Sequence, residues 1–221
     1  MGLVLLLYAS MAQADKCGTA FPINGNGYFV TAGHVLSGAQ KIFVFTKQQG
    51  IVQATSYTIN KANDVGFFFV PKYKSQYLLL SNNPGPYGLG IYGYPRPDIY
   101  GTNLKMYLGT GYKTSFSLLL LRPAIIINAN IWPGNSGGPI ISDKGTVVGL
   151  VTDGLLPSDL PNDGSTQGLG TPTNKVTQLL DRHQVLYFVV DDSKFSKIDF
   201  GMWKGMVEQK DLSVMVCVTE K

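Results

Sequence analysis

Three short segments of the sequence contain side chains that could together perform nucleophilic catalysis. Ser136 lies in GNSGGP, His34 lies in TAGHV, and Asp64 lies in NDVGFF. A serine hydroxyl becomes a nucleophile when a histidine takes its proton, and a carboxylate on the far ring nitrogen orients that histidine. Because the chain has only two histidines, the choice of base is narrow. We predict that His34, Asp64 and Ser136 form a catalytic triad.

Each of these residues also has an ordinary structural interpretation. Ser136 could occupy a plain glycine turn, and Asp64 could cap the entry of the apolar strand that follows it. The second histidine, His183 in LLDRHQ, lies near the end of an amphipathic segment, where it would interact favourably with the helix dipole. The combination of three segments favours the catalytic interpretation of His34 over these alternatives.

The residues around the serine predict an oxyanion hole. Gly134 lets the backbone turn so that its own N–H and that of Ser136 point inward. The same letters match the G-x-S-x-G nucleophile elbow of α/β-hydrolases, in which the serine precedes its acid and histidine. Here the serine comes last and strand-like residues follow it, so the chymotrypsin-type order of histidine, acid and serine fits better.

The elements that must position these residues are short strands. The chain has 221 residues, of which 44% are hydrophobic and 14% charged, with 26 glycines and 12 prolines, a composition typical of strands joined by turns. One helix is expected, from Thr173 to His183. Strands are expected at residues 27–31, 41–45, 51–59, 65–70, 89–94, 104–108, 124–127, 140–142 and 146–152. Many short strands without intervening helices predict an all-β barrel or sandwich.

The first fourteen residues, MGLVLLLYASMAQA, form a separate apolar segment. The small-x-small ending at Ala14 is typical of a signal-peptidase site and predicts a secreted or periplasmic protein. The segment is short and lacks a basic start, so a buried N-terminal strand and a remnant of a longer precursor are alternatives. It cannot span a bilayer, which takes about 20 apolar residues, so we expect no stable membrane span in the mature chain.

The two cysteines and the charges restrict cofactors and partners. Cys17 and Cys217 lie at opposite ends of the chain, where either a disulfide or two free buried thiols is compatible with the sequence. Their spacing is not that of a zinc motif, and we expect no metal and no cofactor. The net charge of +4 comes from scattered lysines and arginines, which argues against a nucleic-acid partner.

The motifs TAGHV, NDVGFF and GNSGGP, with YGYP between the last two and GLGTPTNKVTQLL after them, resemble the trypsin-like serine protease superfamily. Within it, they are most similar to the high-temperature-requirement proteases and their single-domain relatives. The resemblance implies two packed six-stranded antiparallel β-barrels with a C-terminal helix. It suggests barrels at 15–85 and 86–185, after the signal-like segment 1–14, and a C-terminal extension at 186–221 without an assigned role.

The resemblance also implies how a peptide substrate would lie. Thr152 falls where the family often has a hydroxyl bonded to the catalytic aspartate, and the strand up to Gly154 would pair with the substrate backbone. Asn130 would form the base of the primary specificity pocket, with Gly154 and Gly168 on its walls. An uncharged residue at the bottom of the pocket, with glycine walls, favours substrates with neutral, mid-sized to large side chains. The resemblance implies that the Asn135 amide helps Gly134 and Ser136 to bind the oxyanion. In this family Asn135 stands where zymogen-activated members have an aspartate, which argues against that route of activation.

The function predicted from these observations is that of a serine endopeptidase acting on a protein or peptide substrate through an acyl-enzyme intermediate. Two alternatives are kept. One is a processing protease released from a viral or phage polyprotein, in which the apolar N-terminus is a leftover segment. The other is a catalytically inactive homologue that binds peptides in the same cleft.

Overall fold

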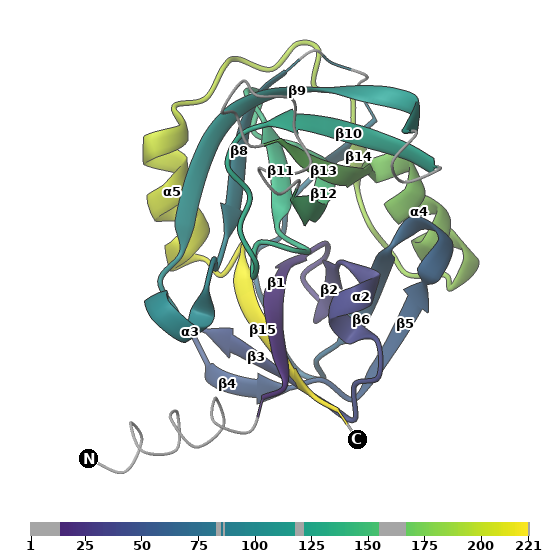
Figure 1. Ribbon diagram of the computed structural model, residues 1–221, viewed down its shortest axis with the longest axis vertical. Coiled ribbons are helices and arrows are strands. Elements are labelled where there is room, and N and C mark those ends of the chain that lie inside the picture. Colours follow the sequence, from purple (N-terminus) through teal and green to yellow (C-terminus); the bar gives the residue numbers. More distant parts are fainter. Residues whose placement is uncertain (1–13, 83–84, 86, 118–121, 155–166, 221) are drawn as a thin grey trace.

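The computed structural model describes residues 14–82, 85, 87–117, 122–154 and 167–220. These residues form two β-sheets with few helices, and the sheets lie one above the other in Figure 1. The all-β class predicted from the sequence is confirmed. Apart from Ala14, the signal-like segment lies outside the described residues.

The first sheet has seven strands in the order β4-β3-β15-β1-β2-β6-β5, and all neighbouring pairs are antiparallel. It contains both ends of the described chain, because the last strand lies between β1 and β3. The strands are β1 (Lys16–Pro22), β2 (Tyr28–Thr31), β3 (Lys41–Thr46), β4 (Gly50–Gln53), β5 (Ser56–Asn60), β6 (Val65–Phe69) and β15 (Val214–Thr219).

The second sheet has eight strands, six of which close into an antiparallel barrel in the order β8-β9-β10-β13-β12-β11 and back to β8. Two short strands, β7 and β14, extend it by parallel pairing next to β12. The strands are β7 (Leu80–Ser81), β8 (Tyr87–Gly93), β9 (Lys105–Ser117), β10 (Arg122–Asn128), β11 (Pro139–Ser142), β12 (Val147–Gly154), β13 (Gly168–Pro172) and β14 (Val189–Val190).

Large aromatic side chains fix the register of the first sheet near the site. Phe29 on β2 lies opposite Phe68 on β6, and their rings stack with centroids 5.3 Å apart, while Tyr73 packs on Phe29. All three are buried, and burying a side chain of this size stabilises the fold by about 1.5–3 kcal/mol. The aromatic contact therefore holds in register the two strands that directly precede His34 and follow Asp64.

The helices are α2 (Gly33–Leu36), η1 (Lys61–Asn63), α3 (Pro97–Tyr100), α4 (Thr173–Arg182) and α5 (Phe200–Gln209). The predicted late helix is confirmed as α4. The sequence analysis missed α5, which contains two glycines and buries only Val207, so it shows neither strong propensity nor a clear apolar face. It begins at Asp199, whose side chain caps the Met202 N–H.

The C-terminal extension crosses from the second sheet to the first. Asp192 is buried and accepts hydrogen bonds from the Ser142 and Thr146 hydroxyls of the second sheet. Further along, the buried Asp211 accepts from the Lys47 and Gln48 N–H groups, at 2.6 and 3.1 Å, in the turn between β3 and β4. The extension therefore ties the two sheets together.

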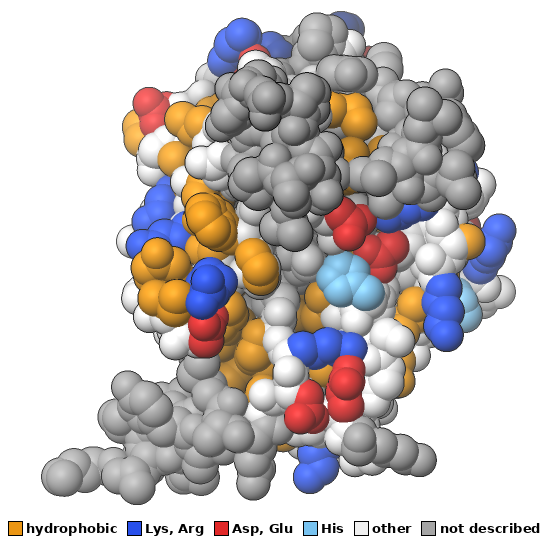
Figure 2. Space-filling model, in the orientation of Figure 1, with side chains coloured by type: hydrophobic (Ala, Val, Ile, Leu, Met, Phe, Trp, Pro, Cys, Tyr) orange, Lys and Arg blue, Asp and Glu red, His pale blue; other side chains and the backbone are white. Residues whose placement is uncertain are grey.

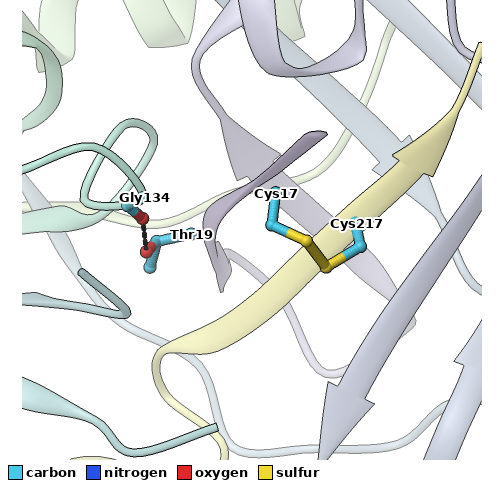
Figure 3. The surroundings of a disulfide bond; sticks show 4 residues. All are labelled: Cys17, Thr19, Gly134 and Cys217. Carbon is cyan, nitrogen blue, oxygen red and sulfur yellow. Dashed lines mark hydrogen bonds between the residues drawn. A yellow bond between two sulfur atoms is a disulfide. The ribbon is translucent and has the colours of Figure 1, made fainter. Parts of the chain in front are cut away.

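The extension ends in β15, which completes the first sheet. Cys17 and Cys217 lie directly opposite each other in β1 and β15, with Cα atoms 4.1 Å apart, and form a disulfide (Figure 3). Of the two alternatives for the cysteines, the disulfide is the one found. It joins strands separated by 200 residues in the sequence.

Candidate active site

His34 and Asp64 contact each other directly at the edge of the first sheet. The ring Nδ1 of His34 lies 2.8 Å from Asp64 Oδ2, and the His34 backbone N–H donates to Oδ1 over 2.8 Å. An ionised carboxylate only accepts hydrogen bonds, so the Nδ1 atom carries the proton and Nε2 of the neutral ring remains an acceptor. Figure 2 shows a histidine at the centre of this face beside acidic side chains.

The backbone conformation orients the side chains of His34 and Asp64 towards each other. His34 is the second residue of α2, which starts directly after β2, and its side chain is about half exposed. Asp64 follows η1 and has φ of 49°, in the left-handed region, which turns the chain before β6. Asp64 is mostly buried, so its carboxylate faces the histidine with little competition from solvent.

The electrostatic surroundings keep Asp64 ionised. Burial alone would raise the pKa of its carboxyl, but the hydrogen bonds and charge of His34 outweigh this effect, and the charge of Arg122 adds to them. The pKa of Asp64 therefore lies below its usual value. Arg122 starts β10 and donates to the Asn63 carbonyl and the Thr171 hydroxyl, and its guanidinium lies 4.0 Å from Asp153.

Ser136 lies in the loop between β10 and β11, in the second sheet. Its hydroxyl is 3.4 Å from the Thr152 carbonyl of β12, and its carbonyl accepts from the Thr19 N–H of β1 at 2.8 Å. Among the described residues, the Ser136 hydroxyl makes no hydrogen bond to His34. The loop thus positions the serine at the boundary of the two sheets, with its hydroxyl held by β12.

The peptide groups on either side of Gly134 and Asn135 are fixed in direction. The Pro133 carbonyl accepts from the Arg96 N–H at 2.7 Å, and the Asn135 carbonyl accepts from Gly138 at 2.9 Å. In a trans peptide the C=O and the N–H point in opposite directions. The N–H groups of Gly134 and Ser136 therefore point away from these partners, and neither has an acceptor among the described residues.

Gly134 is required by this geometry. Its φ is +95°, and a β-carbon at this position would lie 2.2 Å from the Tyr94 carbonyl oxygen. Asn135 contributes neither of its groups to the hole, because its N–H donates to the Trp132 carbonyl at 3.0 Å and its side chain is fully buried. The amide atoms of that side chain have no hydrogen-bond partner among the described residues. The arrangement favours Gly134 and Ser136, not Asn135, as the two donors.

Three of the residues expected to contact substrate, Thr152, Gly154 and Gly168, lie on the neighbouring strands β12 and β13. The Thr152 hydroxyl donates to the Leu169 carbonyl at 3.3 Å and not to Asp64. Gly154 pairs with Gly168 across β12 and β13, as neighbouring walls of one pocket would. Beyond Val151, the other edge of β12 has no strand partner among the described residues, so it is open to an added strand.

Asn130 is exposed, and the side chain that lies between the glycine walls is Ile131. A β-carbon on Gly168 would lie 2.3 Å from Ile131 Cγ1, and one on Gly154 would lie 3.4 Å from Ile131 Cβ. Successive side chains of an extended segment point to opposite sides, so a shift of one residue exchanges the inward side chain. The aliphatic side chain of Ile131 therefore lies at the bottom of the expected pocket, where Asn130 was predicted.

Two hollows lie beside these residues. One, of about 260 Å³, is lined by Gly33, Ser37, Ile59, Lys61 and the His34–Asp64 pair. The other, of about 240 Å³, is lined by Arg96, Ile99, Tyr100, Lys105, Tyr107 and Trp132, next to the serine loop. Apolar side chains gather to the left of the central histidine in Figure 2.

The sequence matches a known family of domains. Residues 18–150 match the family of trypsin-like peptidase domains, a range that includes His34, Asp64 and Ser136. The chain belongs to this family. The resemblance inferred from the sequence motifs is confirmed.

Relatives of the chain include an "Uncharacterized protein y4bJ" of Sinorhizobium fredii, 30% identical over 64% of this chain and 22% of its own length. A "Probable periplasmic serine endoprotease DegP-like" of Buchnera aphidicola is 28% identical over 72% of this chain and 35% of its own. The chain therefore spans only about a fifth to a third of the length of these relatives.

Solved structures share the fold. The HtrA-type protease AlgW, determined with a decapeptide, has a TM-score of 0.63 and 22% identity, covering 74% of this chain and 50% of its own. The Rv3671c protease in its inactive form has a TM-score of 0.61 and 23% identity, covering 80% and 92%. The predicted two-barrel type of fold is confirmed, but the first half is not a closed six-stranded barrel. Its seven described strands form an open half-barrel, whereas the second sheet contains a closed six-stranded barrel to which β7 and β14 are added.

Among the described residues, no helix has the length and apolar character needed to cross a membrane. No group of three or more histidine, cysteine, aspartate or glutamate side chains among them could hold a metal ion.

The sequence analysis missed three residues that the structure brings to the site: Thr19, Arg122 and Ile131. A signal existed for Arg122, which is an isolated charge in the apolar run LLLLRPAIII and so needs a polar partner when buried. Thr19 showed no signal, because its partners in the serine loop lie more than a hundred residues away.

Proposed function

We propose that the chain is a serine endopeptidase that cleaves peptide bonds through His34, Asp64 and Ser136. The observation that supports this most is the bonded His34–Asp64 pair, which leaves the second ring nitrogen of the histidine available as a base. The relatives named as serine endoproteases support the same activity.

In the proposed reaction, His34 Nε2 takes the hydroxyl proton of Ser136 while the serine Oγ bonds to the scissile carbonyl carbon. The histidine then gives this proton to the departing amine, which leaves an acyl-enzyme. A water molecule attacks the ester in the same way and returns the serine. Asp64 keeps the proton on Nδ1 and stabilises the imidazolium that forms twice in each cycle.

The developing oxyanion would be bound by the Gly134 and Ser136 N–H groups. Each such donor is worth about 10²–10³ in kcat in serine proteases. The Ser136 hydroxyl would first exchange its contact with the Thr152 carbonyl for one with His34. Hydrogen bonds of catalytic groups are often long or poorly aligned without substrate and tighten only when substrate binds.

A substrate strand would add to the open edge of β12 around Thr152 and Gly154. Ile131 fills the space between Gly154 and Gly168, which favours small or mid-sized aliphatic side chains before the scissile bond over the larger ones expected from the sequence. Peptide-library digestion tests this. Replacement of Ile131 by alanine should shift preference towards larger residues by about tenfold or more, since a missing methylene contact is worth about 1–3 kcal/mol. Ile51→Ala, a partly buried site on β4, serves as the control and should leave the preference unchanged.

The location is proposed to be secreted or periplasmic. The signal-like segment at residues 1–14 and the relatives named as periplasmic endoproteases support this location over release from a viral polyprotein.

Labelling with a fluorophosphonate probe tests the function. The folded wild type should be labelled, and Ser136→Ala should lose all labelling. Ser37→Ala removes another serine hydroxyl from the hollow beside His34 and should leave labelling intact. A folded wild type that is not labelled would favour the inactive peptide-binding homologue, and labelling that survives in Ser136→Ala would assign the nucleophile elsewhere.

A further inference from the structure

Thr19, at the middle of β1, makes three hydrogen bonds to the second sheet at the base of the serine loop. Its hydroxyl donates to the Gly134 carbonyl at 2.7 Å and accepts from the Tyr94 N–H at 3.1 Å (Figure 3 shows the first). Its N–H donates to the Ser136 carbonyl at 2.8 Å. The residue is fully buried, so no solvent competes for these bonds.

We propose that Thr19 is a positioning residue that keeps the oxyanion hole in its donor arrangement. The proposal rests on the proposed protease function. Gly134 at φ +95° has no side chain to restrain it, so its peptide groups rotate easily unless they are bonded. The Thr19 hydroxyl holds the Gly134 carbonyl, and the Thr19 N–H holds the Ser136 carbonyl, so the two donor residues are both held by one residue of the other sheet.

Loss of the hydroxyl would leave the buried Gly134 carbonyl without a donor. An unsatisfied buried carbonyl is costly, and without the Thr19 hydroxyl this peptide keeps only the bond from the Asn135 N–H to the Trp132 carbonyl among the described residues, so it would turn towards another donor. The two oxyanion donors belong to the neighbouring peptides. A change in ψ of Gly134 that φ of Asn135 does not fully offset therefore changes the direction of one donor relative to the other. Oxyanion stabilisation requires these donors to be in place before the reaction, so the effect falls on the transition state.

The neighbouring Thr31 shows what a purely structural threonine does here. It is equally buried, but its hydroxyl donates to the Thr19 carbonyl within the first sheet. Thr19 differs because its hydroxyl reaches a carbonyl 115 residues away in the loop of the nucleophile. The strand that carries it is held on one edge by β2 and on the other by β15 and the Cys17–Cys217 disulfide.

The test compares Thr19→Val, which keeps the shape and removes the hydroxyl, with Thr19→Ser, which keeps the hydroxyl. Thr173→Val is the matched control, because Thr173 is fully buried and its hydroxyl also donates to backbone carbonyls, those of Ser81 and Val148. Direct removal of one oxyanion donor costs about 10²–10³ in kcat. We expect Thr19→Val to lower kcat roughly 10–100-fold, with KM within about threefold, and Thr19→Ser to restore kcat to within about threefold.

A second readout separates positioning from general destabilisation. A peptidyl trifluoromethyl ketone forms a tetrahedral adduct whose oxyanion occupies the hole. Its affinity should fall in parallel with kcat in Thr19→Val, while the affinity for a product-like peptide stays unchanged. An unchanged kcat in a folded Thr19→Val, or an equal loss in Thr173→Val, would overturn the proposal. If Thr19→Val does not fold, Thr19→Ala is measured with the same expectations.

The outcome also distinguishes this proposal from the proposed function. If the wild type is not labelled by fluorophosphonate, the protease function fails, and amide hydrogen exchange of residues 132–138 then decides the role of Thr19. Faster exchange in this segment in Thr19→Val than in Thr173→Val supports the positioning role. Equal exchange in the two variants refutes it.

Discussion

The two halves of the candidate site are held in place in different ways. His34 and Asp64 both come from the first sheet, lie 30 residues apart, and are joined by two bonds to each other. Ser136 and Gly134 belong to the second sheet, yet their carbonyls are bonded to Thr19 of the first. The acid–base pair is thus largely self-contained, whereas the nucleophile loop depends on a strand from elsewhere in the chain.

This difference separates two kinds of change. A change within the acid–base pair should act on proton transfer and leave the loop as it is. A change to β1 or its supports should act on the loop and leave the bond between His34 and Asp64 intact. Variants of the two regions can therefore be distinguished by whether they change proton transfer, measured as kcat, or hydrogen exchange in the serine loop.

The largest effect is expected from Asp64→Asn. An amide at this position no longer holds the proton on His34 Nδ1, so Nε2 carries it and cannot accept the serine proton. We expect kcat to fall roughly 10⁴-fold at neutral pH, the loss seen for this change in a serine protease triad. Steady-state kinetics would measure it.

Asp153→Asn is the matched control for this change, because Asp153 also faces Arg122 but makes no hydrogen bond to His34 among the described residues. It should change kcat less than tenfold. Hydrogen exchange of the serine loop should be the same in Asp64→Asn as in the wild type. A faster exchange there would mean that the pair and the loop are not independent.

A smaller effect, on stability, is expected when Cys17 and Cys217 are both replaced by serine. The disulfide closes a loop of about 200 residues, and loss of a native disulfide commonly costs about 2–5 kcal/mol in the free energy of unfolding. Urea unfolding of the oxidised protein and the double variant would measure the loss. A reductant should destabilise the wild type and have no effect on the variant.

Hydrogen exchange would show which strands are destabilised when the disulfide is removed. Because β15 lies between β1 and β3 in an open sheet, exchange should rise in these three strands before it rises in the closed second barrel. If exchange rises first in the second barrel, the first sheet does not depend on the disulfide in the way described.

Much of the fold, and the segments that form the candidate site, could be predicted from the sequence because they depend on local patterns. Strand positions follow from apolar runs and turn residues, and α4 follows from its apolar spacing. The position of β15 between β1 and β3 could not be predicted from the sequence. Any apolar strand can pair with an unpaired strand edge, and the hydrophobic periodicity does not indicate which strand will be its partner. The same holds for Thr19, whose role depends on contact with Gly134 across two sheets.

The position of Ile131 where Asn130 was expected has a different cause. The family resemblance points to Asn130, whereas Ile131 is the side chain that lies against Gly154 and Gly168. Side chains of an extended segment alternate between two sides, and only the backbone direction selects between neighbours. Asn135 likewise has a polar side chain next to the nucleophile, yet it is buried and its N–H is used by Trp132. In both cases the direction of the side chain depends on the backbone, and residue type alone does not give it.

The smallest effect is expected from an electrostatic link between the acid–base pair and the second sheet, the charge of Arg122. The pKa of Asp64 lies below its ordinary value of 3.8, so ionised Asp64 stabilises the fold above about pH 4, and this contribution is lost as the pH falls through the lowered pKa. Arg122→Met removes one of the causes that lower this pKa. A smaller part of the stability should therefore depend on Asp64, and less should be lost on acidification.

A double-mutant cycle with Asp64→Asn isolates this term from the other bonds that Arg122 makes. We expect a coupling free energy of about 0.5–1 kcal/mol at pH 6, measured by urea unfolding, that shrinks towards zero near pH 3 as Asp64 is protonated. A coupling that stays constant over this range would mean that Arg122 supports the pair through the Asn63 carbonyl and not through charge. The second sheet would then position the backbone next to Asp64, and the acid–base pair would be independent of that sheet only in its electrostatics.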